Sequence, residues 1–205
     1  MRVPTVAYDS VEAARAGDLS ASRQRSLNGA WRLRLFDSPD EATLEPAGAA
    51  HAVEVPGNWT MQGTGDLPHY TNVQMPFDGP PPRLPEHNPT GVYHRSFTAP
   101  RAWMRGRRIV LHIGGAESVH AAYINGQFAG YGTDSRLASE YDITDLVHAG
   151  SNDVAVVVVR YSARRHAPRD GGRPSTTDPD PRRSSARCTG RRPRRRRSSR
   201  HGRGR

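Results

Sequence analysis

The chain has 205 residues, and its 30 basic residues, all of them Arg, outnumber 20 Asp and Glu, which gives a formal net charge of +10. The charge is unevenly divided: residues 1–162 hold 14 Arg against 17 acidic residues, a net of −3, whereas residues 163–205 hold 16 Arg against 3 Asp, a net of +13. Strong basicity normally points to a nucleic-acid partner, but the first 162 residues are mildly acidic, so that inference is excluded for them.

Length and apolar patterning define the broad class of protein. Residues 1–162 are long enough for one domain with its own core. The N-terminus has no apolar segment of the signal-peptide kind, and the longest apolar run, Val154 to Val159, is far shorter than the roughly 20 residues that a spanning helix needs. The single cysteine, Cys188, can form no internal disulfide. These features predict a cytoplasmic protein without membrane association.

Alternation of apolar and polar residues predicts strands rather than helices along most of the chain. A short helix is expected over residues 10–16, and one helical turn over 144–148 with Thr144 as its N-cap. Asn125-Gly126 predicts a type I′ hairpin turn, because both positions of that turn need positive φ. The predicted strands cover residues 31–35, 52–55, 92–97, 108–113, 119–124, 127–131 and 153–161.

Two of these segments carry further expectations. The strand at 153–161 is apolar on both faces, which predicts a central strand covered on both sides. Residues 57–89 form a long stretch rich in Pro and Gly, and a loop of that length inside a domain is usually functional or packed against another element.

Several short strands with hairpin turns and no βαβ alternation predict an all-β jelly-roll sandwich. The expected organisation is an N-terminal extension over residues 1–21, the sandwich over 22–162, and a disordered Arg-rich tail over 163–205, which has too few apolar side chains to fold.

A series of motifs runs through the predicted domain in a specific order. They read RSLNGAW at 25–31, VPGNW at 55–59, YTNV at 70–73, EHNPTGVY at 86–93, YINGQ at 123–127, GYGTDSR at 130–136, SEYD at 139–142 and RYS at 160–162. In that order and spacing, residues 22–162 resemble the N-terminal sugar-binding domain of the family 2 glycoside hydrolases, specifically the β-galactosidases.

The resemblance implies a jelly-roll domain that packs against a catalytic (β/α)8 barrel. In the family the barrel carries two glutamates, an acid/base and a nucleophile, in a retaining mechanism. A barrel takes about 250 residues, more than residues 163–205 provide, so we expect no catalytic residue in this chain and no hydrolysis by the chain alone. The family's Mg and Na ligands are also mostly absent, so we expect no metal site and no cofactor here. By resemblance, the partners are a galactoside, the barrel and further copies in a homo-oligomer.

One family contact with the substrate maps onto the chain. Asn72, in the YTNV motif, matches the position whose amide reaches into the galactosyl pocket, and an amide can both donate to and accept from sugar hydroxyls. A second family contact is an aspartate directly after the RYS motif, which also contributes to a sodium site. That position is Ala163, so the chain departs from the family pattern where the tail begins.

The tail suggests an out-of-frame product. Lys-free sequence rich in Arg, Pro, Gly and Ser is typical of a GC-rich coding region read in the wrong frame, so we expect a frameshift after about Ser162. The alternative is a selected basic tail, whose Arg run at 191–197 would bind nucleic acid only non-specifically, through phosphates. Two function classes therefore stay open: a β-galactosidase fragment, and a stand-alone carbohydrate-binding or basic interaction module.

Other candidate residues favour structural roles. Asp134 belongs to a predicted turn with a local ion pair, and Glu140 and Asp142 are expected to cap and turn the backbone rather than catalyse. The histidines show no zinc spacing. Trp31 and Trp59 are expected in the core, and Trp103, after Pro100, is expected to be partly exposed.

Overall fold

The computed structural model describes residues 6–17, 22–69, 76–77, 79–80, 82–135 and 137–162, together with the backbone of residues 186–191. It contains one short α-helix, two 3-10 helices and ten strands within these residues. They are α1 (Val11–Ala16), β1 (Gln24–Ser26), β2 (Gly29–Phe36), β3 (His51–Val55), η2 (Trp59–Met61), β4 (Thr90–Ala99), η3 (Arg101–Met104), β5 (Arg108–Ile113), β6 (Val119–Ile124), β7 (Gln127–Gly132), β8 (Ser139–Asp142), β9 (Gly150–Val159) and β10 (Ala186–Arg191).

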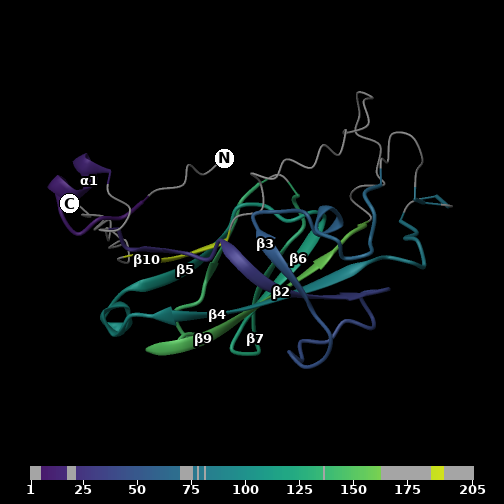
Figure 1. Cartoon of the computed structure of the whole chain (residues 1–205). Coiled ribbons are helices and arrows are strands. Elements are labelled where there is room, and N and C mark those ends of the chain that lie inside the picture. The colour runs from purple at the N-terminus through teal and green to yellow at the C-terminus, as the bar shows by residue number, and fades with distance from the viewer. Residues whose placement is uncertain are drawn as a thin grey trace, which may run out of the picture.

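These strands form two antiparallel sheets around one core (Figure 1). One sheet has six strands in the order β3-β2-β4-β9-β6-β7, and the other has four in the order β1-β10-β5-β8. Neighbours in space are often distant in the chain, as expected for two sheets that exchange strands. The arrangement confirms the predicted all-β sandwich of the jelly-roll class.

The six-stranded sheet is built around β9. This strand pairs with β4 along its whole length and with β6 on its other edge. Val154, Val156 and Val158 belong to the core, while on the opposite face Ala155 is buried and Val157 is half-buried. The predicted central position is confirmed, and the second face is covered only in part.

The hairpin between β6 and β7 has the predicted type I′ turn. Asn125 has φ 51° and Gly126 has φ 78°, which is the left-handed backbone that this turn requires. Asn125 also ties the turn to the start of β9, because its Oδ1 accepts from the backbone N–H of Asp153 at 2.9 Å and its Nδ2 donates to Asn152 Oδ1 at 2.9 Å. A single residue therefore sets both the turn and the register of its neighbour.

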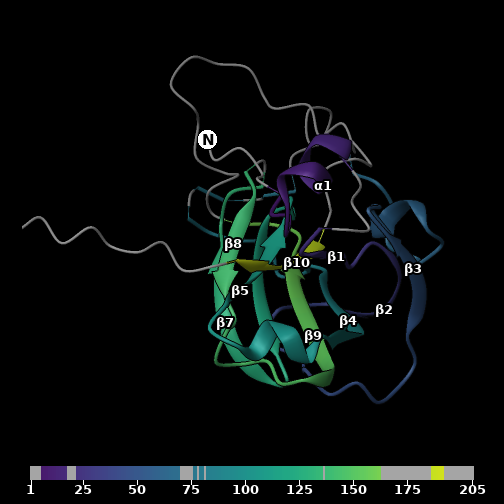
Figure 2. The ribbon, with the colours of Figure 1, turned by 90° about the vertical axis from the view of Figure 1, so that its left-hand side faces the viewer.

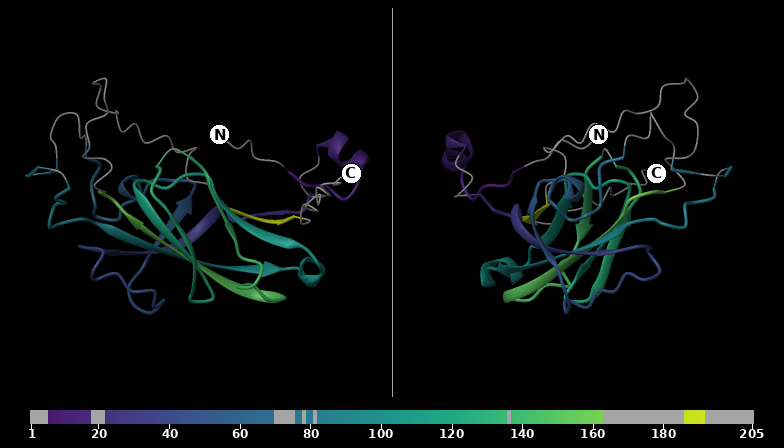
Figure 3. Two further views of the ribbon diagram at one scale, coloured as in Figure 1. Left: turned by 180° about the vertical axis from the view of Figure 1, so that it is seen from behind. Right: turned by 45° about the vertical axis from the view of Figure 1, so that its right-hand side comes forward.

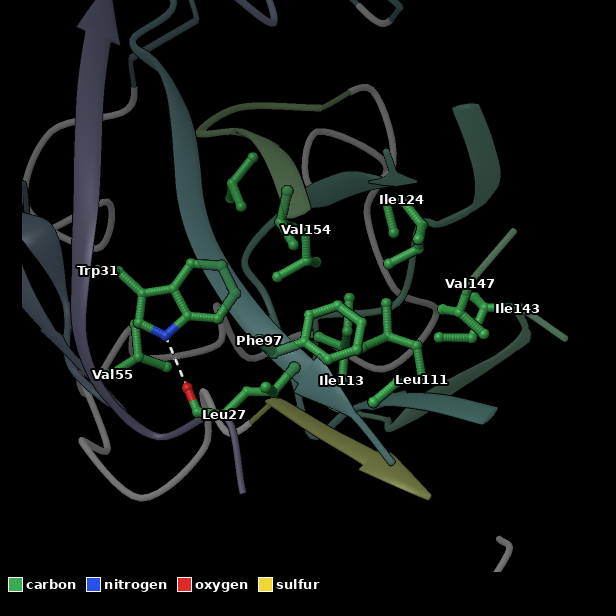
Figure 4. Close-up of a cluster of buried hydrophobic side chains, with 14 of the residues drawn as sticks. Leu27, Trp31, Val55, Phe97, Leu111, Ile113, Ile124, Ile143, Val147 and Val154 are labelled. Atoms are coloured by element: carbon green, nitrogen blue, oxygen red, sulfur yellow. Dashed lines mark hydrogen bonds between the residues drawn. The ribbon is translucent and has the colours of Figure 1, made fainter. Parts of the chain in front are cut away.

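Side chains from both sheets meet in the core (Figure 4). Phe97 and Val154 come from the six-stranded sheet, and Leu111 comes from β5 of the other. The indole of Trp31 is buried, and its Nε1 donates to the Leu27 carbonyl at 2.7 Å, so burial of this polar atom is compensated.

The prediction that Trp103 is partly exposed is wrong. Its exposed fraction is 6 %, because η3 begins directly after Pro100 and folds the indole back into the core. The backbone N–H of Trp103 donates to the Pro100 carbonyl at 2.9 Å, which closes this turn. Trp31 and Trp59 are both buried, as predicted.

Two local predictions have different outcomes. The helix near the N-terminus is confirmed as α1, with Ser10 as its cap, and it lies outside both sheets without a buried residue (Figure 3). The expected N-cap at Thr144 is wrong: the turn is capped by Asp142, whose Oδ1 accepts from the Thr144 N–H at 3.1 Å. The Thr144 hydroxyl instead accepts from the Ile109 N–H at 2.9 Å, which joins the turn to β5.

Residues 186–191 depart from the predicted disorder of the tail. Their backbone forms β10, which lies between β1 and β5 in the four-stranded sheet (Figure 2). The rest of 163–205, including Ala163, lies outside the described residues, as do Met75 and Arg136. Within the described part of the chain, no helix is long and apolar enough to cross a membrane.

Candidate functional site

Three separate segments meet at the C-terminal end of β9. They are residues 160–162, the loop 57–69 that follows β3, and residues 82–90 that lead into β4. The backbone N–H of Arg160 donates to the Pro89 carbonyl at 3.0 Å, and in Figure 1 the arrowhead of β9 ends beside these loops. Three of the sequence motifs, at 55–59, 86–93 and 160–162, therefore lie together in space.

Asp66 joins two of these segments through its carboxylate. One oxygen, Oδ2, accepts from Trp59 Nε1 at 2.6 Å, and the other, Oδ1, forms an ion pair with the Arg160 guanidinium. Arg160 also donates from Nη2 to the Leu67 carbonyl at 2.8 Å. The side chains of Arg160 and Asp66 are only 13 % and 16 % exposed, so solvent screens their attraction weakly. This pair fixes the loop 57–69 against the end of β9.

Asn88 fixes the third segment to the same strand end. Its side-chain Oδ1 accepts from the Tyr161 N–H at 2.9 Å, and its Nδ2 donates to the Tyr161 carbonyl at 3.1 Å. Tyr161 lies beyond the end of β9, and the Asn88 amide makes the two backbone hydrogen bonds that a neighbouring strand would otherwise make. Asn88 is buried, and its own N–H donates to the Asp37 carbonyl at 2.9 Å, so no part of this clip is exposed to competing water.

The buried ring of Tyr161 is surrounded by groups from the same loops. The Phe77 ring lies 5.8 Å away and the His69 ring 6.5 Å away, both edge-to-face, and the Arg160 guanidinium lies 5.3 Å from the ring centre. The predicted substrate-binding residue, Asn72, lies outside the described residues. The two residues nearest to it on either side for which contacts are known, His69 and Phe77, both contact this one ring.

The start of the loop depends on a close approach of two elements. Trp59 packs against β4 at Gly91, where an added Cβ would lie 2.9 Å from Leu33 Cδ1 and 3.0 Å from Trp59 Cζ3. Asn58 caps η2 by accepting from the Thr60 N–H at 3.2 Å. The VPGNW and PTGVY motifs thus place the indole where its N–H reaches Asp66.

Apolar side chains are exposed on the same loops. The exposed fractions are 65 % for Met61, 75 % for Leu67 and 39 % for Leu84. All three belong to the stretch 57–89, which we expected to be functional or packed against another element. Phe77, in the same stretch, is instead half-buried against Tyr161. Clustered apolar groups on one loop system are typical of an interface.

The carboxylates on β8 have structural contacts, as predicted. Asp142 Oδ2 accepts from Arg108 Nε at 2.6 Å, and Glu140 Oε1 lies 3.5 Å from His112 Nδ1. Burial raises the pKa of Asp142, but hydrogen bonds from Thr144 and Arg108 outweigh that effect and hold the pKa below its usual value. Across the described residues, no three His, Cys, Asp or Glu side chains gather as a metal site requires.

A buried histidine contacts β8 through Tyr141, the residue between these two carboxylates. His120, on β6, is only 1 % exposed, and burial lowers its pKa to about 4. Its Nε2 lies 2.8 Å from the Tyr141 hydroxyl, and burial raises the pKa of that hydroxyl too. Both groups are therefore neutral at pH 7, and we assign them to packing.

The site at the end of β9 can position loops, but Asp66 cannot act as a free acid or base. Both of its oxygens are engaged, one by an indole N–H and one by a guanidinium. Sequence reasoning identified Arg160 and Asn88 only as parts of motifs and missed Asp66. No local signal marks this aspartate, since its role depends on a fold that brings residue 160 next to residue 66.

Comparison with known proteins agrees with this architecture. A family model described as "Glycosyl hydrolases family 2, sugar binding domain" matches residues 24–171. The chain therefore belongs to this family. It is 36 % identical over 162 residues to a β-galactosidase of Aeromonas hydrophila and 39 % identical over 164 residues to one of Yersinia pestis. These matches cover 74 % and 78 % of the chain but only 16 % and 15 % of the two relatives.

Solved structures show the same fold. A β-glucuronidase of Bifidobacterium dentium aligns with 66 % of the chain at a TM-score of 0.51 and 26 % identity, and the alignment covers 20 % of that protein. A β-glucuronidase of an uncultured Clostridium species aligns with 77 % of the chain at a TM-score of 0.54 and 21 % identity, which covers 24 % of it. The chain thus corresponds in both comparisons to a small part of a much longer enzyme.

Proposed function

We propose that this chain is the N-terminal sugar-binding domain of a cytoplasmic β-galactosidase, an enzyme that hydrolyses terminal β-galactosides. In this proposal the loops at the end of β9 form one side of the galactose pocket, and Asn72 supplies hydrogen bonds to sugar hydroxyls. The two glutamates of the retaining mechanism come from a catalytic barrel that follows this domain in the relatives' architecture.

The observation that carries the proposal is the anchoring of both flanks of residues 70–75 on Tyr161. His69 and Phe77 both contact its ring. Tyr161 is itself held by Asn88 at both its N–H and its carbonyl. The described residues on both flanks of 70–75 thus rest on a fixed strand end, as the neighbours of a preorganised site need.

The exposed apolar residues of the same loops support a covalently linked or associated barrel as the partner. Met61, Leu67 and Leu84 are exposed beside a site whose polar groups are already engaged. Burying such side chains against a second domain contributes roughly 1.5–3 kcal/mol for each large residue. In the family the complete enzyme forms homo-oligomers, and we propose the same for the complete enzyme to which this domain would belong.

A chimera tests the proposal. Residues 1–162 of this chain replace the matching segment of the Aeromonas hydrophila relative, and hydrolysis of a chromogenic β-galactoside is measured. We expect turnover, and we expect Asn72→Ala to lower kcat/KM by about 2- to 150-fold, since it removes one or two hydrogen bonds of about 0.5–1.5 kcal/mol each.

The matched control is Asp40→Ala, an exposed residue of the loop between β2 and β3, which should leave kcat/KM unchanged. A soluble chimera with native-like tryptophan fluorescence but no turnover would refute the proposed function. Equal activity of the Asn72→Ala and control chimeras would instead refute only the role of Asn72.

The 205-residue chain alone is expected to be inactive. Retaining hydrolysis needs two carboxyl groups about 5–5.5 Å apart, and Asp66, a carboxylate at the end of β9, is engaged on both oxygens by structural contacts. The alternative is a stand-alone carbohydrate-binding module, or a basic module in which Arg191–Arg197 binds phosphates. Galactose binding by the purified chain that is lost in Asn72→Ala would favour the module, and we expect no measurable binding.

A further inference from the structure

The four-stranded sheet is completed by a strand from far along the chain. β10 pairs with β1 through Gln24↔Thr189, Arg25↔Cys188 and Ser26↔Arg187, and with β5 over all six of its residues. In Figure 2 it lies between these two strands. Residues 160–185 separate it from β9, the central strand of the domain. The strand thus occupies a slot that the first 162 residues form but do not fill.

One edge of the slot is β5, a strand of the hydrophobic core. β5 is hydrogen-bonded to β8 on its other side, and Ile109, Leu111 and Ile113 of β5 are fully buried in the core. An empty slot would expose the backbone N–H and C=O groups of this core strand, which is a ready template for pairing with another chain. It would also leave β1 without its only strand partner in the described ladders.

The register gives the slot a sequence preference. Ala186, Cys188 and Gly190 stand opposite Ile113, Leu111 and Ile109, so all three positions on the core-side face of the sheet hold small residues. Directly opposite residues in an antiparallel pair share a face. The slot therefore suits a strand that has small residues opposite the bulky core residues of β5.

The other face of the slot carries charges of both signs. Arg187 and Thr189 of β10 stand opposite His112 and Val110, which in turn stand opposite Glu140 and Asp142 of β8. On the same face Arg191 stands opposite Arg108, which forms an ion pair with Asp142. This face therefore favours neither a basic nor an acidic strand, and the selectivity of the slot rests on its core-side face.

We propose that the edge of β5 is a strand-recognition site for an extended peptide that has small residues at alternate positions, and that residues 186–191 of the same chain occupy it. Recognition is by strand addition, in which main-chain hydrogen bonds provide affinity and alternate side chains provide selectivity. Because β10 pairs only within the four-stranded sheet, it can leave the slot without unfolding the six-stranded sheet. The same sequence supplied as a free peptide should then bind the vacated slot.

A disulfide crosslink tests the occupancy in the full chain. Cys188 is the only cysteine in the sequence, and it stands directly opposite Arg25, at a Cα separation of about 4.5–5.5 Å that a disulfide can span. After mild oxidation, Arg25→Cys should form an intramolecular disulfide in monomeric protein. The matched control, Asp40→Cys, should not. A disulfide-linked dimer of Arg25→Cys, or no disulfide at all, would overturn occupancy of the slot by its own chain.

Peptide rescue tests recognition. Thr189→Pro removes a backbone N–H from the middle of β10, and amide exchange at residues 109–113 should accelerate at least tenfold, whereas Arg195→Pro, outside the strand, should leave exchange unchanged. Excess synthetic peptide of residues 184–193 should restore protection in Thr189→Pro. Unchanged exchange in Thr189→Pro, or failure of the peptide to restore protection, contradicts the proposal. Tryptophan fluorescence of Thr189→Pro shows whether its core is intact. If the variant is unfolded, the Arg25→Cys disulfide alone tests whether residues 186–191 occupy the slot.

Discussion

Removal of the Asp66 carboxylate should lower the free energy of unfolding by more than is usual for an aspartate in a surface loop. Asp66→Ala leaves the buried indole N–H of Trp59 without its acceptor and the Arg160 guanidinium without its counter-charge. A hydrogen bond to a charged group contributes about 1.5–3 kcal/mol. The ion pair is partly exposed, so its loss costs more than the 0–1 kcal/mol of a surface pair and less than the 3–5 kcal/mol of a buried one.

Together these losses predict a decrease of about 3 kcal/mol in the free energy of unfolding. Urea unfolding of the full chain, followed by tryptophan fluorescence and by circular dichroism, measures it. Asp66→Asn keeps an acceptor for the indole and loses only the charge, so it should fall about midway. Asp40→Ala, in an exposed position, should stay within about 0.5 kcal/mol of the wild-type value.

A double-mutant cycle with Arg160→Met separates the two contacts. The coupling energy between residues 66 and 160 should be about 1–2 kcal/mol, and the remainder should belong to Trp59. The reasoning is refuted if Asp66→Ala unfolds at the same urea concentration as Asp40→Ala. It is also refuted if the cycle shows no coupling, because the ion pair would then contribute nothing to fixing the loop.

Three further predictions concern the core, a tight contact and the coding sequence. Because burial lowers the pKa of His120 to about 4, the unfolded chain binds a proton below pH 6.5 that the folded domain rejects, so stability should fall by about 3 kcal/mol between pH 6.5 and pH 4; urea titrations of His120→Gln should lack this slope, and an unchanged slope would contradict it. Gly130→Ala places a Cβ 2.4 Å from the Tyr141 ring and should cost about 2–3 kcal/mol in thermal unfolding, against about 1 kcal/mol for Gly106→Ala, where φ is also positive but the space is open. Reading the DNA in the other two frames after the Ser162 codon should reveal about 250 residues of barrel-like sequence, and early stop codons in both frames would exclude the frameshift.

The strands that sequence predicts correctly are those whose alternation reflects one buried face. β2 is an example, since Trp31 and Leu33 are buried while Arg32 between them is exposed. The Asn125-Gly126 turn is equally local, because positive φ at two positions restricts residue choice there. In both cases the physical cause lies within a few residues of the pattern.

The features that sequence does not predict depend on distant partners. β8 is a four-residue strand of mostly polar residues, and only pairing with β5 defines it. β10 is rich in Arg and has no apolar alternation, so the slot beside β5, rather than its own propensity, determines its conformation. Asp66 has its role because residue 160 lies beside it, more than ninety positions along the chain.

The candidate site was predictable as a set of motifs but not as a geometry. The motifs containing Trp59, Asn88 and Arg160 were each marked by resemblance, and the structure brings all three to the end of β9. What joins them, a shared carboxylate and a bidentate amide clip, follows from tertiary contacts alone. Asn72 remains a prediction, because it lies outside the described residues.

The central position of β9 has a consequence for synthesis on the ribosome. The edge of β4 that β9 occupies is complete by Ala99, yet its partner ends at Val159. At about 5–20 residues per second, that edge of β4 stays unpaired for roughly 3–12 s during translation. The sheet is dominated by contacts of high sequence separation, which form slowly. Nascent chains of this domain should therefore depend on chaperones that shield β4 until β9 emerges.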